Sequence, residues 1–219
     1  MTRAIKQKFV IVFAFIVLAE LFLMNIESVF SIHYFTKPLI VGSLIAYFIP
    51  HSKHLEKSTK NLTLLALVFS VIGDMFLMNS DKFFVQGLIA FLIAHIFYIL
   101  VFSRKRNSKT NPIGFLVLIA LYGCILFYVI KDGLDKMLIP VLIYMLVILT
   151  MGIFAFCRKG FVPKQSFYLV FLGALFFIFS DSLIALDKFY MPIPLARTGI
   201  ILSYAFAQLL IVSGIIKQQ

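Results

Sequence analysis

Eight long apolar runs follow one another along the chain, and short polar breaks separate them. A helix needs about 20 apolar residues to cross the hydrocarbon core of a bilayer, and each run has close to that length. With 62% hydrophobic and only 13% charged residues and a mean hydropathy of +1.05, the chain can be neither a water-soluble domain nor a disordered segment. We therefore predict an all-α, polytopic membrane protein with eight transmembrane helices. The runs are Phe9–Met24, Tyr34–Ile49, Leu62–Met78, Phe83–Phe102, Ile113–Ile130, Leu138–Phe156, Phe167–Leu186 and Leu195–Ile216.

The first run follows three basic residues and so resembles a signal peptide, but it is long for one and seven further runs follow it. We expect it to be an uncleaved first helix. We further expect one transmembrane domain over residues 1–219. A weak repeat of four plus four helices, over about 1–105 and 106–219, is suggested by similar short stretches around Asp74 and Asp181.

The basic residues are distributed unevenly between the two sides that eight alternating spans define. If the N-terminus is cytoplasmic, 14 of the 20 Lys and Arg residues lie on the cytoplasmic side, which predicts that both termini are cytoplasmic. This bias explains the net charge of +11 through an anionic membrane surface, without a nucleic-acid partner. We expect an integral protein of a bacterial cytoplasmic (inner) membrane.

Five ionisable residues lie within the predicted spans, one on each of five helices. Such residues are costly in a membrane, and each is a candidate for function. Four are predicted to lie in the outer half and His95 near the midplane, so that all five fit one cavity that opens outward. They are Glu20, Lys37, Asp74, His95 and Asp181.

Further polar residues lie at helical spacing from these groups or from each other, which puts them on shared helix faces. The pairs are Ser70 with Asp74, His95 with Tyr98 and Tyr204 with Gln208, with Arg197 two turns before Tyr204. Simpler interpretations stay open for all of them. An aspartate or histidine can join helices by hydrogen bonds alone, Glu20 and Lys37 can reach the interface, and tyrosines often only pack. Neither the two cysteines nor the scattered carboxylates have metal-site spacing, and we expect no metal or other cofactor.

Five stretches, in this order and on five different helices, resemble the lysoplasmalogenase (YhhN-like) family of eight-span membrane proteins. The resemblance spans nearly the whole chain, and the ordered set is more specific than any single motif. The stretches are Thr36–Leu39, Ser70–Leu77, Gly87–Tyr98, Gly173–Leu183 and Tyr204–Ile211.

The resemblance implies an enzyme, an ether hydrolase that cleaves the vinyl ether bond of lysoplasmalogens with water. The products would be a fatty aldehyde and a glycerophospho-base, ethanolamine or choline. It also implies that the aspartates of the Gly-Asp and Ser-Asp motifs, Asp74 and Asp181, are catalytic.

The chemistry of a vinyl ether agrees with such residues. Its β-carbon must be protonated to give an oxocarbenium ion, which water captures, and the resulting hemiacetal collapses to aldehyde and alcohol. Glycosidases manage a similar cation with two carboxyl groups, one as acid and one to activate water. Two nearby carboxyls in a low-dielectric site would hold one proton between them, and we expect Asp74 and Asp181 to form such a pair. The sequence does not assign the acid to either aspartate.

Supporting roles are expected for the remaining polar residues. Lys37 and Arg197 are candidates to hold the phosphate of a lysophospholipid substrate. His95, Tyr98, Tyr204 and Gln208 would orient the carboxyl groups or the water, Ser180 and Ser182 would donate to Asp181, and Ser70 and Glu20 complete the polar set.

Two other function classes compete with the hydrolase. Buried ionisable groups on several helices also mark proton- or ion-coupled transporters. Against a transporter, the polar residues concentrate in the outer half and do not line a path across the membrane. The other alternative is a lipid-binding membrane protein without turnover.

Overall fold

Eight α-helices and two short 3₁₀ turns make up the part of the chain described by the computed structural model, which covers residues 3–24 and 30–218; no β-strand occurs there. All eight predicted apolar runs form helices, and the all-α prediction is confirmed. The helices are α1 (Arg3–Leu23), α2 (Phe30–His51), α3 (Lys57–Leu77), α4 (Ser80–Ser103), α5 (Ile113–Ile130), α6 (Leu138–Phe156), α7 (Lys164–Phe189) and α8 (Ala196–Ile216).

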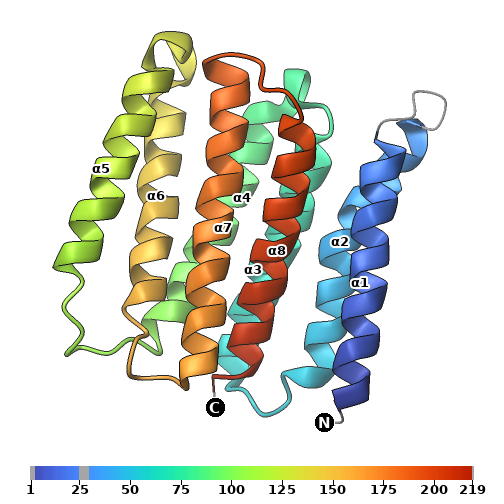
Figure 1. The fold of residues 1–219 in the computed structure, drawn as a ribbon, viewed down its shortest axis with the longest axis vertical. Coiled ribbons are helices and arrows are strands. Elements are labelled where there is room, and N and C mark those ends of the chain that lie inside the picture. Colours follow the sequence, from blue (N-terminus) through green and yellow to red (C-terminus); the bar gives the residue numbers. More distant parts are fainter. Residues whose placement is uncertain (1–2, 25–29, 219) are drawn as a thin grey trace.

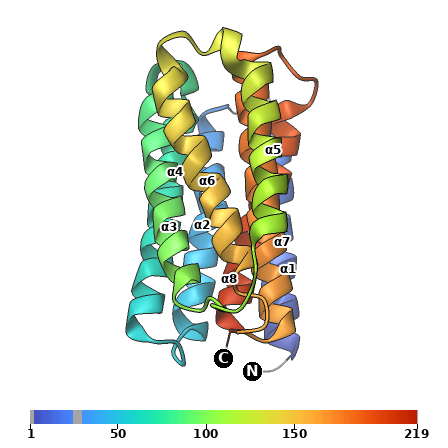
Figure 2. The ribbon, with the colours of Figure 1, turned by 90° about the vertical axis from the view of Figure 1, so that its left-hand side faces the viewer.

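The helices stand roughly side by side and alternate in direction, as short connections between apolar spans require (Figures 1 and 2). The hairpin of α1 and α2 lies at one edge of the bundle and α5 at the other. The start of α1 and the end of α8 lie at the same end, as an even number of antiparallel helices demands (Figure 1).

Six helices, α3 to α8, are long and apolar enough to cross a membrane. Large apolar side chains also cover the outward faces of α1 and α5, such as Phe15 and Leu118, which are 72% and 63% exposed. In water such faces would be unstable, whereas lipid tails cover them at no cost. The chain is therefore an integral, multi-pass membrane protein.

Glycines allow the central helices to approach each other closely. A Cβ atom on Gly173 of α7 would lie 2.9 Å from the carbonyl oxygen of Ala207 on α8, and one on Gly73 of α3 would lie 2.6 Å from the Phe91 ring of α4. Small residues let helix backbones pack closely in a membrane. The two contacts fix α7 on α8 and α3 on α4, the helices that carry most of the predicted site.

Arg158, which follows α6, is fully buried beside Gln218, which follows α8. Its Nη2 atom donates to Ser166 Oγ of α7 at 3.1 Å and to Gln218 Oε1 after α8 at 3.0 Å, so it ties three segments together. Burial lowers the pKa of its guanidinium to about 9. From the sequence we counted Arg158 among the basic residues of the loops. In the structure its side chain is internal and connects three segments by hydrogen bonds.

Candidate active site

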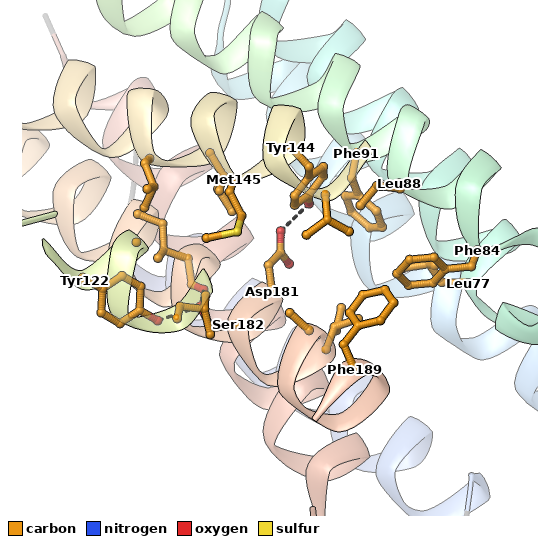
Figure 3. Close-up of a pocket in the computed structure, with 18 residues that line it drawn as sticks. Leu77, Phe84, Leu88, Phe91, Tyr122, Tyr144, Met145, Asp181, Ser182 and Phe189 are labelled. Carbon is orange, nitrogen blue, oxygen red and sulfur yellow. Dashed lines mark hydrogen bonds between the residues drawn. The ribbon is translucent and has the colours of Figure 1, made fainter. Parts of the chain in front are cut away.

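An apolar cleft with about 670 Å³ of empty space, counted to its open mouth, lies among α4, α5, α6 and α7, with Leu77 of α3 at its edge. Its lining is almost wholly aliphatic and aromatic, and Asp181 of α7 points into it (Figure 3). The polar lining residues are Tyr122, Tyr144, Asp181 and Ser182. Asp181 is the acidic residue among the side chains that line this cleft.

Tyr144 of α6 holds Asp181 in place: its hydroxyl donates a hydrogen bond to Asp181 Oδ2 (Figure 3). His95 of α4 also lies close, with its Nε2 atom 4.0 Å from the same oxygen. The His95 side chain is fully buried, and neither ring nitrogen has a hydrogen-bond partner among the residues that the structure describes. A buried polar group without a partner is unusual, and an internal water beside Asp181 would give these nitrogens one.

Asp74 of α3 has a different environment. Only 2% of its surface is exposed, and it accepts a 2.8 Å hydrogen bond from the Tyr204 hydroxyl of α8. Gln208, one turn further along α8, donates to Ser70 Oγ at 2.9 Å and accepts from the Tyr98 hydroxyl at 2.6 Å. The helical spacing thus brings these five side chains into one closed network that joins α3, α4 and α8.

A series of packed aromatic rings links the surroundings of the two aspartates. The Phe177 ring packs edge-on against Tyr204, with centroids 5.4 Å apart, and against His95 at 4.6 Å. His95 in turn packs edge-on against Tyr144 at 5.4 Å. The carboxylates are close enough to influence each other electrostatically, but no hydrogen bond between them occurs among the described residues. The expected sharing of one proton between Asp74 and Asp181 stays a prediction.

The remaining ionisable residues do not line the cleft, so the prediction of one cavity for all five groups is wrong. Glu20 of α1 is fully buried and accepts a hydrogen bond from Thr36 of α2, so it does not reach the interface. Glu20 and the half-buried Lys37 are charged neighbours of Asp74. Arg197, at the start of α8, is exposed. The two basic candidates for phosphate binding therefore lie away from the cleft lining.

The two serines beside Asp181 donate their hydrogen bonds to backbone carbonyl oxygens and not to the carboxylate. Ser180 Oγ donates to Ile200 O at 3.1 Å, and Ser182 Oγ donates to Ile178 O at 2.7 Å. A hydroxyl has one proton to donate, so the expected hydrogen bonds from these serines to Asp181 do not form. Ser182 instead accepts a 2.6 Å hydrogen bond from the hydroxyl of Tyr122 of α5 (Figure 3).

The sequence analysis named neither Tyr122 of α5 nor Tyr144 of α6 as a site residue. A signal for Tyr144 was present. Tyr144 lies four residues before Ile148 and seven before Met151, so the three side chains share one face of α6, which is buried. No comparable signal marks Tyr122, since few residues of α5 are buried. Within residues 3–24 and 30–218, no three His, Cys, Asp or Glu side chains gather as a metal-ligand group.

Comparison with known proteins supports the resemblance seen in the motifs. The model of the YhhN family matches residues 32–215, most of the chain. The chain belongs to the YhhN family. Both Asp74 and Asp181 lie inside the region that matches this family.

Curated relatives of this YhhN protein include two human proteins. Lysoplasmalogenase TMEM86A from Homo sapiens is 33% identical over 157 residues, which cover 70% of this chain and 64% of the relative. Lysoplasmalogenase TMEM86B from Homo sapiens is 34% identical over 146 residues, 67% of this chain and 59% of the relative. The bovine TMEM86A is 32% identical over 158 residues. The matches thus span less than two thirds of the length of each human relative. No solved structure shows significant similarity to the chain.

Proposed function

We propose that this protein hydrolyses the vinyl ether bond of a lysoplasmalogen, a single-chain 1-alkenyl glycerophospholipid, to a fatty aldehyde and a glycerophospho-base. One observation carries the proposal: a single carboxyl group in an apolar cleft of a YhhN protein. The relatives' names, which state lysoplasmalogenase activity, agree with this chemistry.

Asp181 is the group that exchanges protons with the substrate. In its protonated form it gives its proton to the β-carbon of the alkenyl chain, and the double bond shifts to leave an oxocarbenium ion. Tyr144 donates to one oxygen of Asp181, which orients the carboxyl group and leaves the other oxygen for the transfer. The carboxylate that remains stabilises the cation in a medium of low dielectric constant.

Water then adds to the cationic carbon and completes the reaction. Asp181 takes back a proton from this water, and the hemiacetal collapses into the aldehyde and the glycerol hydroxyl. His95 is well placed to hold the water, because its unpartnered Nε2 atom lies 4.0 Å from Asp181 Oδ2. A water between the two groups would have a partner on each side.

Asp74 supports this chemistry without touching the substrate. It is enclosed by its own hydrogen-bond network but lies within electrostatic range of Asp181. A second negative charge nearby favours the protonated form of a carboxyl group and, after the transfer, stabilises the cation. Asp181 is therefore the catalytic residue of the proposal, and Asp74 tunes its charge state.

The proposal includes the membrane arrangement that the charges predict. All eight helices would span a bacterial cytoplasmic membrane with both termini inside, and the basic loops would face its anionic surface. The lipid chain would enter the cleft from the bilayer while its phosphate stays at the mouth. The transporter alternative gains no support from the names of the relatives.

The test is the release of fatty aldehyde by the detergent-purified protein from 1-alkenyl-lysophosphatidylethanolamine. The 1-alkyl and 1-acyl lysolipids, matched in chain length, are the controls, because neither has the double bond that is protonated. We expect aldehyde from the alkenyl lipid alone and, in D₂O, one deuterium on the aldehyde carbon next to the carbonyl. A folded protein that releases no aldehyde, or that cleaves the acyl lipid instead, would contradict the proposal.

A further inference from the structure

A second polar pair lies in the apolar cleft, next to the proposed catalytic carboxyl. Tyr122 of α5 and Ser182 of α7 both line the cleft, and Ser182 directly follows Asp181 in the chain (Figure 3). Their hydroxyls are 2.6 Å apart. Polar groups in such a lining are few, and where they occur they usually fix the orientation of a ligand.

The direction of the hydrogen bonds determines what this pair can bind. The Ser182 hydroxyl gives its proton to Ile178 O at 2.7 Å, so Tyr122 must be the donor in the bond between the two side chains. A tyrosine hydroxyl has one proton, which is thereby used, and its oxygen keeps only the capacity to accept. The Tyr122 oxygen can therefore accept a hydrogen bond from a donor on a bound molecule.

The chemistry of the cleft limits which donor this is. Its lining contains no Lys or Arg side chain that could balance a phosphate, so a phosphate and the ammonium group beyond it stay at the mouth or outside. What can enter is the hydrocarbon chain, the ether and the adjoining part of the glycerol. In a single-chain glycerophospholipid, the donor in that part is the free hydroxyl on the central glycerol carbon.

We propose that Tyr122, oriented by Ser182, is a specificity residue that accepts a hydrogen bond from the central glycerol hydroxyl of the lipid. This inference rests on the proposed function. It explains at the level of atoms how the cleft would select a one-chain lipid. An ester at that carbon offers only acceptors to the Tyr122 oxygen, and two acceptors cannot pair.

The experiment compares two substrates on the same enzymes: 1-alkenyl-lysophosphatidylethanolamine and its 2-deoxy analogue, which lacks only the central hydroxyl. The readout is kcat/KM for aldehyde release by the full chain in detergent. We expect the wild type to prefer the hydroxyl substrate by roughly threefold to tenfold, the range for one neutral hydrogen bond. Tyr122→Phe should bring this ratio close to one by slowing the hydroxyl substrate only.

Two further variants separate recognition from a general effect on the fold. In Ser182→Ala the Tyr122 hydroxyl loses the oxygen to which it donates, so it is no longer fixed as an acceptor toward the lipid. We expect this variant also to lower the preference for the hydroxyl substrate. The matched control is Tyr128→Phe, because Tyr128 is on the same helix but is 72% exposed and outside the cleft lining. This control should keep the wild-type ratio.

A Tyr122→Phe variant that keeps the wild-type ratio would overturn the inference and leave the hydrolase proposal intact. Equal loss of both substrates in that variant would also overturn it, since this would show a structural role. A wild-type protein that cleaves neither substrate would instead contradict the proposed function itself.

Discussion

The surroundings of Asp181 and Asp74 differ in the kind of neighbours each carboxylate has. Asp181 faces an apolar cleft, with one tyrosine as its hydrogen-bond donor and beside it a histidine whose ring nitrogens have no hydrogen-bond partner in the described part of the chain. Asp74 is 2% exposed, and around it the donors and acceptors of Tyr204, Gln208, Ser70 and Tyr98 are matched to each other. A site that must receive a ligand needs unused polar capacity, whereas a satisfied network stabilises the fold.

The difference teaches that two similar motifs need not have equal roles. Both aspartates follow a small residue on a helix of the same direction, and sequence alone treats them alike. The surrounding helices separate their roles: α5 and α6 leave space beside Asp181, while α8 covers Asp74. We infer that one carboxylate meets the lipid and the other acts on it through its charge.

Asp181→Asn tests this difference with the largest expected effect. The amide cannot give a proton to carbon, so kcat for aldehyde release should fall by about 10²- to 10⁴-fold, the usual contribution of a direct acid or base. Asp132→Asn, at a side chain that is 86% exposed, is the control and should retain full activity. Full activity in the Asp181 variant would contradict its role as the acid.

Asp74→Asn should reduce kcat less, by roughly 10- to 100-fold, because Asp74 acts only through its charge. The amide oxygen can still accept from Tyr204, so the protein should remain folded. KM should stay close to the wild-type value, since Asp74 does not line the cleft. The inequality between the two aspartates would be refuted if this variant lost as much activity as Asp181→Asn, or if its KM rose strongly.

The two tyrosines that donate to the aspartates offer a matched pair. Tyr144→Phe removes the hydrogen bond that orients Asp181 and should lower kcat by about tenfold, as loss of a bond to a charged group does. Tyr204→Phe removes the corresponding bond to Asp74 and should lower kcat less than threefold. Both are measured in the aldehyde assay, with Tyr168→Phe, at an exposed position, as control. A larger loss of kcat in Tyr204→Phe than in Tyr144→Phe would contradict the account, because it would indicate that Asp74 and not Asp181 is the catalytic carboxyl group.

Gln208→Leu should affect stability more than activity. Tyr98 loses the acceptor for its hydroxyl, and an unsatisfied buried polar group costs about 1–3 kcal/mol. Thermal denaturation in detergent should shift to lower temperature while kcat changes by less than about threefold. Gln165→Leu, at an exposed position at the start of α7, is the comparison and should leave the midpoint unchanged. A variant of unchanged stability but lost activity would place Gln208 in catalysis.

The helix ends were predictable from the sequence to within three residues, except at the starts of α1, α2 and α3, where helix and apolar run differ by four to six residues. For example, α7 begins at Lys164 and ends at Phe189, while its apolar run covers 167–186. Apolar runs mark the lipid-spanning part, but helices extend past it wherever the backbone hydrogen bonds can continue. Polar partners on one helix, such as Tyr204 and Gln208, were also predictable, because residues four apart lie on the same face of a helix.

The cleft was not predictable, because it depends on which helices stay apart. Depth along each helix is similar for Asp74 and Asp181, and this suggested one shared cavity. Depth says nothing about rotation around the helix axis or about the packed rings of Phe177 and His95 that link their surroundings. The partner Tyr144 was missed because no ionisable residue on α6 drew attention to that helix.

The suggested repeat of four plus four helices stays a prediction, and the neighbours of the two aspartates offer one way to test it. Asp74 of the first half accepts from Tyr204 on the last helix of the second half, and Asp181 of the second half has His95 of the last helix of the first half at 4.0 Å. If the repeat is real, the two halves exchange partners across the middle of the bundle. The repeat predicts that His95→Tyr keeps a higher midpoint of thermal denaturation than His95→Ala.

The most direct test of the unequal roles measures which aspartate position a molecule in the cleft can reach. In a background in which Cys124 and Cys157 are replaced by serine, Asp181→Cys and Asp74→Cys are treated with N-ethylmaleimide, with and without the 1-alkenyl lysolipid. We predict rapid labelling at position 181 that the lipid suppresses, and slow labelling at position 74 that the lipid leaves unchanged. Labelling at position 74 that the lipid suppresses, with none at position 181, would contradict the account.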